Sequence, residues 1–174
     1  MKTKPEKVLR TLNMVAWVGF VVLAIRAGAL LTSYGVSIFN PAATKNLYMG
    51  LDLSPLREHS FWHYTSMILL KIAFYVLEAY VAYLLISVLS KIRMKNPFTM
   101  EVANNLVRMS NVITAAWIVA VIHNWYVGWL SFDIAGLKLN VIPLEFIFVS
   151  GVLFVIAQIF KKGVELQTEN ELTV

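Results

Sequence analysis

The chain has 174 residues, of which 59% are apolar, 14% are charged and none is cysteine. An average soluble domain is about 45–50% apolar and about 25% charged, so a soluble enzyme, a disordered chain and a secreted disulfide scaffold all fit poorly. The lack of cysteine excludes disulfides, cysteine–zinc sites and thiol chemistry. The composition therefore predicts an integral membrane protein.

Four apolar stretches are long enough to cross a bilayer as helices, which takes about 20 residues each. We expect spans over about 12–38, 61–89, 103–130 and 141–160, followed by a solvated cytoplasmic tail over 161–174. Asn140 is the expected N-cap of the last span. The predicted fold class is an all-α integral membrane protein, a bundle of four transmembrane helices in one membrane domain.

Lysine and arginine are distributed unequally between the ends of these spans. Most lie in the N-terminal arm, in the connection between the second and third spans and after the fourth span. Because such residues favour the cytoplasmic side, we expect both termini in the cytoplasm. The formal charge of +5 then indicates topology and attraction to anionic lipid, without direct binding to nucleic acid. A cleavable signal peptide ending near residues 27–29 is the alternative, which would leave three spans.

Ionisable side chains inside the spans are costly, at about 2.5–3.5 kcal/mol each near a helix centre. Arg26, Glu78 and Glu145 fall within about 5 Å of one level when height is counted along each helix. We therefore predict a buried polar cluster of these three residues, which Lys71 either joins or leaves by snorkelling outward. The cluster acts either as a structural clasp or as the lining of an ion path, and both interpretations stay open.

Three histidines lie toward the predicted outer side. His59 and His63 are four residues apart, a spacing that places two metal ligands on one helix face, and His123 is near the outer end of the third span. A zinc or copper site, or a haem held between His63 and His123, is one hypothesis. The plainer interpretation, which we adopt, is polar residues near lipid head groups with no cofactor. No catalytic motif occurs, so we predict no catalytic residues and no enzyme.

The connection before the third span ends in Asn96-Pro97-Phe98-Thr99, where Thr99 is the expected N-cap of the third span. Together with the stretch from residue 163 to 174, this motif resembles a family of bacterial four-span membrane proteins catalogued as domain of unknown function 2975. Glu171 stands where the family tail carries Asp. The resemblance implies a small inner-membrane protein, often encoded beside a small helix-turn-helix regulator, and it implies no activity.

Three functions remain open at this point. The first is a non-enzymatic sensor, regulatory or interaction protein in the lipid bilayer, with a cytoplasmic helix-turn-helix regulator as partner. Its contact surfaces would be Asn96, Pro97, Phe98 and Thr99 together with Leu166, Glu169, Asn170 and Leu172. The second is a small transporter or channel, assembled as a homo-oligomer around the polar cluster. The third is a metal-binding or haem-binding membrane protein.

Overall fold

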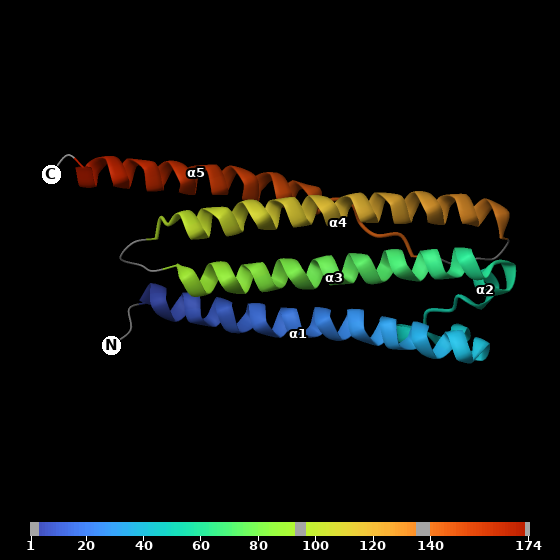
Figure 1. Cartoon of the computed structure of the whole chain (residues 1–174). Coiled ribbons are helices and arrows are strands. Elements are labelled where there is room, and N and C mark those ends of the chain that lie inside the picture. The colour runs from blue at the N-terminus through green and yellow to red at the C-terminus, as the bar shows by residue number, and fades with distance from the viewer. Residues whose placement is uncertain (1–3, 93–96, 135–139, 173–174) are drawn as a thin grey trace. The chain divides into compact units, whose positions relative to one another are not determined.

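The computed structural model describes residues 4–92, 97–134 and 140–172. The described chain is helical, with a single isolated bridge between Leu47 and Leu51 in place of any strand. Figure 1 shows the long helices and the connections between them, the first of which contains the short helix α2. The elements are α1 (Lys4–Phe39), the 3₁₀ helices η1 (Pro41–Asn46) and η2 (Tyr48–Gly50), α2 (Ser54–His59), α3 (Phe61–Lys91), α4 (Met100–Asp133) and α5 (Ile147–Leu172).

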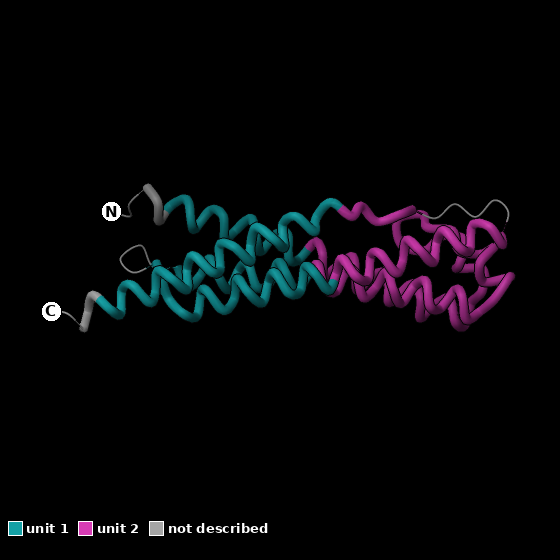
Figure 2. The backbone as a smooth tube through the Cα atoms, turned by 90° about the horizontal axis from the view of Figure 1, so that it is seen from above, with its two compact units in different colours: residues 1–21, 79–115, 145–174 teal, residues 22–78, 116–144 magenta. Residues whose placement is uncertain are grey.

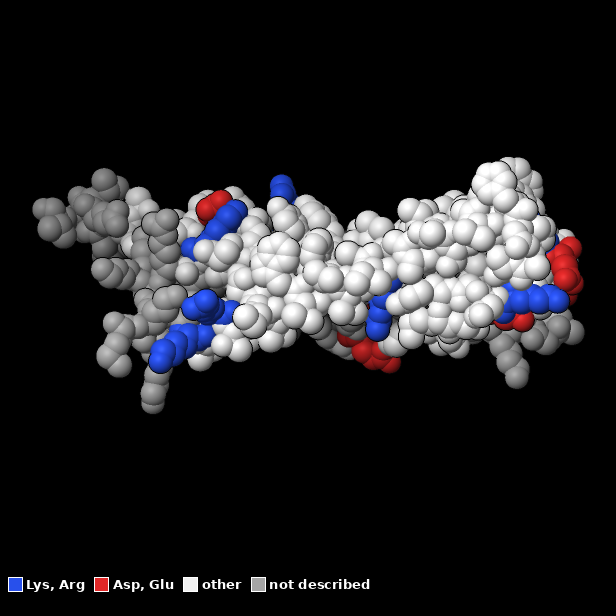
Figure 3. Space-filling model, turned by 90° about the horizontal axis from the view of Figure 1, so that it is seen from below, with Lys and Arg blue, Asp and Glu red and all other residues white. Residues whose placement is uncertain are grey.

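Four of these helices are long and apolar enough to cross a membrane. Within the described residues the candidate spans are Lys7–Phe39, Phe61–Lys91, Met100–Asp133 and Ile147–Glu169. Many of their outward side chains are themselves apolar, such as Val18 on α1 and Val152 on α5. A helix satisfies its own backbone hydrogen bonds, so it suits a solvent that offers none. The predicted all-α class is confirmed, and the four helices indicate a multi-pass membrane protein. Figure 3 shows one face, on which charged side chains gather in a few places between broad uncharged areas.

The fourth helix begins later than the sequence predicted. Asn140 is not an N-cap, because residues 140–144 are non-helical and α5 starts at Ile147. The backbone of this segment is bonded instead by side chains of α4. The Asn124 amide donates to the Ile142 carbonyl at 2.7 Å and accepts from the Ile142 N–H at 2.8 Å. The Trp117 indole donates to the Leu144 carbonyl at 3.1 Å.

The end of the chain is helical, which the sequence analysis did not predict. The expected solvated tail over 161–174 is helical as far as Leu172, because α5 continues past the apolar stretch without a break. Within this extension Lys162 pairs with Glu165 at 3.0 Å, one helical turn away. Pairs at this spacing support an exposed helix by a few tenths of a kcal/mol, about 0.2–0.5.

The chain forms two compact units, coloured separately in Figure 2. Unit 1 contains residues 1–21, 79–115 and 145–174, and unit 2 contains residues 22–78 and 116–144. The core of unit 1 is formed by Leu84, Val88, Val102, Leu106, Met109 and Ala157. A polar contact joins α4 to α5 in the same unit, where the Ser110 and Ser150 hydroxyls each donate to the other residue's carbonyl, at 3.0 and 2.9 Å.

Part of the core of unit 2 comes from the connection between α1 and α3. Leu47, Leu53 and Leu56 of this connection are almost completely buried, and they pack with Tyr64 and Met67 of α3. Leucines that leave water in this way contribute about 1.5–3 kcal/mol each, which explains why the connection folds onto the helices.

Candidate ligand-binding pocket

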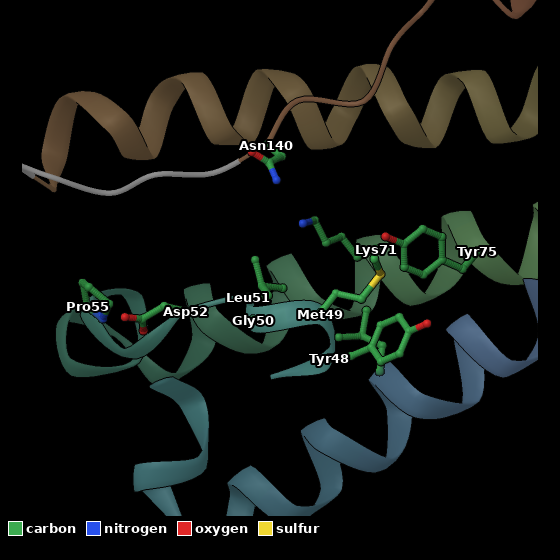
Figure 4. Close-up of a pocket in the computed structure, with 10 residues that line it drawn as sticks. Tyr48, Met49, Gly50, Leu51, Asp52, Pro55, Lys71, Tyr75 and Asn140 are labelled. Carbon is green, nitrogen blue, oxygen red and sulfur yellow. The ribbon is translucent and has the colours of Figure 1, made fainter. Parts of the chain in front are cut away.

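A pocket of about 480 Å³ lies in unit 2 (Figure 4). This volume is in the range of small-molecule sites, which are about 300–1,000 Å³. The walls come from α1, α3, the connection between them and the segment that follows α4. The residues that line it are Leu30, Tyr48, Met49, Gly50, Leu51, Asp52, Pro55, Lys71, Tyr75 and Asn140.

One wall is the short turn from Tyr48 to Asp52, and hydrogen bonds hold it at both ends. The Leu47 N–H donates to the Leu51 carbonyl at 2.9 Å, which closes the turn. The Asp52 carboxylate accepts from the Ser54 N–H at 2.9 Å and from the Ser54 hydroxyl at 2.7 Å. These bonds hold the pKa of Asp52 below its usual value, since they favour the charged form. The wall is therefore an ordered part of the site.

Met49 lines the pocket in an unusual backbone conformation. Its φ of 59° is in the left-handed region, and it is the one described non-glycine residue with a positive φ. Gly50 follows with a φ of 74°, which costs glycine little. For a side chain with a Cβ this conformation costs about 1–2 kcal/mol. Met49 is 78% exposed, so packing of its side chain does not explain the strain.

Lys71 is the buried charged residue of the site. It lies on α3, is only 8% exposed, and its amine points toward Asn140 (Figure 4). Within the described part of the chain it has neither an ion pair nor a hydrogen bond. His123, which is fully buried, is near enough to interact with Lys71 electrostatically, and its Nε2 also has no described partner. An ammonium in a largely buried residue without a partner is costly, so an anion bound in the pocket would stabilise the charged form of Lys71.

Arg26 and Glu78 are both half-buried in unit 2, on α1 and α3. They interact electrostatically, although no described pair of their atoms comes within ion-pair distance. Glu145 is exposed and belongs to unit 1, in the turn before α5 and not inside a helix. A single cluster of Arg26, Glu78 and Glu145 therefore stays a prediction.

The histidines are distributed differently from the expected metal pair. His59 ends α2 and lies 3.4 Å from the Asp133 carboxylate, whereas His63 belongs to α3. Their rings still stack, with centroids 6.0 Å apart, and His63 Nδ1 hydrogen-bonds the Tyr126 hydroxyl. His123 is buried beside Asn124. In the residues that the structure describes, no three His, Cys, Asp or Glu side chains converge on a possible metal position.

The comparison with protein families covers nearly the whole chain. The model of a family described as "Protein of unknown function (DUF2975)" matches residues 5–174. The chain belongs to this family. The resemblance seen in the sequence is thereby confirmed. No curated protein and no solved structure matches the chain.

The motif that suggested the DUF2975 family lies partly in the described structure. Asn96 is outside the described residues, Pro97 and Phe98 precede α4, and the Thr99 hydroxyl accepts from the Val102 N–H at 3.3 Å. The predicted N-cap at Thr99 is therefore confirmed. Phe98 packs on Phe160 of α5, with ring centroids 5.2 Å apart.

The remaining predicted contact residues of this DUF2975 protein lie on α5. Leu166 and Glu169 are exposed there. Asn170 and Leu172 belong to the last turn of the helix, with side chains outside the described residues. Their role in binding a partner stays a prediction.

Most of the pocket was not visible in the sequence. Lys71 was singled out as a charge within a span, and Tyr75, four residues later, lies on the same helix face. Tyr48, Asp52 and Asn140 carried no signal as ligand-binding residues, because only the folded connection and the unwound segment after α4 bring them to Lys71.

Proposed function

We propose that this DUF2975 protein is a non-enzymatic membrane sensor that binds a small ligand in the pocket of unit 2. The observation that carries the proposal is Lys71, which lines a cavity of about 480 Å³, is only 8% exposed and has no ion pair within the described residues. A concave site of this volume in which a few polar groups converge is a usual form of a ligand site. The strained Met49 at its wall supports the proposal, because such strain gathers at functional sites.

The output of the sensor is a contact with a cytoplasmic regulator, for which the family resemblance supplies the candidate. Phe98 and Leu166 are partly or largely exposed and supply apolar contact area, and Glu165 and Glu169 of α5 supply charge. Ligand binding changes such a contact only if the ligand binds one state of the protein more tightly than another.

Ligand binding is tested by thermal denaturation of the purified protein in neutral detergent against a library of small metabolites. A ligand raises the melting temperature by mass action. The Asn140→Trp variant, which fills the pocket from an exposed position, removes this rise. The matched variant Asn104→Trp, on an exposed face of α4, keeps it. A library in which no compound raises the melting temperature of the wild type would contradict the proposal.

The regulatory output is tested separately, by pulldown with a small helix-turn-helix regulator of the kind that the family resemblance implies. We expect the full chain to retain this protein and a chain truncated after Lys162 to lose it. Equal retention by the two chains would remove α5 as the contact surface.

A small oligomeric transporter or channel is the second candidate. Arg26 and Glu78 favour it, since charges inside spans often mark the path of an ion or a proton. Flux into liposomes should then fall when Glu78 is replaced by glutamine. Flux that is unchanged by Glu78→Gln and by Glu145→Gln would eliminate this function.

A further inference from the structure

We propose that the pocket of unit 2 takes a monoanionic amphiphile, a molecule with one carboxylate or phosphate group on an apolar chain, and that Lys71 is its counter-ion. This inference rests on the proposed function and specifies the ligand class. It concerns a site built from α1, α3, the turn at residues 48–52 and Asn140.

The unsatisfied polar groups of the pocket indicate an anion. The Lys71 amine has three donors and no described partner. Tyr75 and Asn140 line the same pocket, the Tyr75 hydroxyl points toward Lys71 in Figure 4, and neither side chain has a hydrogen bond within the described part of the chain. A carboxylate or phosphate placed at Lys71 accepts from the amine and from neighbouring donors together.

The opposite end of the pocket limits the ligand to one anionic group. The Asp52 carboxylate lies there beside Pro55, at the far end from Lys71 in Figure 4. It already accepts two hydrogen bonds from Ser54. A second anionic group at this end would be repelled by the Asp52 carboxylate, which has no proton to donate to it.

Part of the lining is apolar, and this part suits an apolar chain. Leu30, Met49, Leu51 and Pro55 share the pocket with the polar groups. Lys71 is ten residues beyond Phe61, the start of α3, which corresponds to about 15 Å along the helix. A small, strongly hydrated anion loses its water on entering such a site, whereas an amphiphile gains by burying its chain.

The experiment measures binding of decanoate to the purified full chain in neutral detergent by calorimetry. Decanol and decylamine are the matched neutral and cationic probes. We expect decanoate to bind, and we expect the affinities of decanol and decylamine to be lower by about tenfold or more. Lys71→Met should weaken decanoate binding by about tenfold or more, because the counter-ion is lost. Lys71→Arg should retain most of the binding.

Two further variants keep the test decisive if Lys71→Met does not fold. Tyr75→Phe removes one donor and retains the ring, so it should weaken decanoate binding a few-fold. Lys45→Met removes an exposed lysine of the same unit and should leave binding unchanged. In nanodiscs of phosphatidylcholine, displacement of decanoate by phosphatidylglycerol assigns the site to a lipid head group, and retention assigns it to a free carboxylate.

The outcomes separate this inference from the proposed function. Equal binding of decanol and decanoate, or decanoate binding that survives Lys71→Met, overturns the anionic ligand and leaves a ligand pocket in place. Failure of all three probes together with failure of the metabolite library overturns both. Loss of decanoate binding in the Lys45→Met variant also contradicts the inference, since it would place the anion at the surface.

Discussion

The aromatic ring of Phe98 lies against Gly163 of α5, so closely that a Cβ built on Gly163 would be 2.6 Å from Phe98 Cδ1. Both residues belong to unit 1. The sequence suggested the motif around Phe98 and the end of the chain as two contact surfaces for partners. In the folded protein they contact each other, and Phe98 remains 37% exposed.

Replacement of Gly163 by alanine should destabilise unit 1. The added methyl group overlaps the Phe98 ring, and overpacking of this kind costs about 1–3 kcal/mol. The measurement is the melting temperature in neutral detergent. When Gly163→Ala is combined with Phe98→Ala, the alanine at position 163 should no longer destabilise the protein, because the overlap with the ring is removed.

Gly151 provides the control on the same helix. A Cβ at this position meets no atom within 4 Å. Gly151→Ala should therefore be neutral or stabilising by up to about 1 kcal/mol, as expected for alanine in a helix. Equal melting temperatures for the two alanine variants would contradict the contact between Phe98 and Gly163.

Asn124→Ala should destabilise the segment that precedes α5. The amide makes two hydrogen bonds to the backbone of Ile142, and their loss leaves a donor and an acceptor unpaired. Each unpaired buried group costs about 1–3 kcal/mol. Hydrogen exchange of residues 140–144 and the melting temperature measure the effect. Asn111→Ala, at an exposed position of α4, should have no effect on either measurement.

Met49→Gly should stabilise the protein by about 1 kcal/mol, because glycine adopts a φ of 59° without a clash. Met49→Ala retains the Cβ and should give no such gain. Thermal denaturation of the three proteins measures the difference. A loss of stability in the glycine variant would show that Met49 contributes more by its side chain than its backbone strain costs.

Asp52 should contribute to the dependence of stability on acid. Its pKa is lowered in the folded state by the Ser54 hydroxyl and N–H. The contribution is present above the unfolded pKa of about 3.9 and is lost as the pH falls through the lower folded pKa. Asp52→Asn should remove this contribution to the change of melting temperature with pH, and Ser54→Ala should reduce it. Glu58→Gln, an exposed acid of α2, should leave it in place.

The positions of the long helices follow from local sequence. Runs of apolar residues identify α1, α3 and α4, because hydrocarbon as a solvent permits helices and little else. Most of the ends of these helices agree with the prediction within a few residues, and the exception is the start of α1 at Lys4. The cap at Thr99 is equally local, since a side chain and a backbone group three residues apart form it. Lys71 also stands out, because a charge within an apolar run is costly wherever the helix packs.

The start of α5 and the walls of the pocket depend on contacts between residues far apart in the chain. Asn124 bonds Ile142 across 18 positions, and this contact favours an unwound backbone over the helix that hydropathy predicts. Tyr48 and Asp52 share a pocket with Lys71 only after buried leucines fold the connection onto α3, and Asn140 joins this pocket from the segment after α4. Hydropathy reports the solvent of each residue, whereas a binding site depends on which distant residues share one cavity.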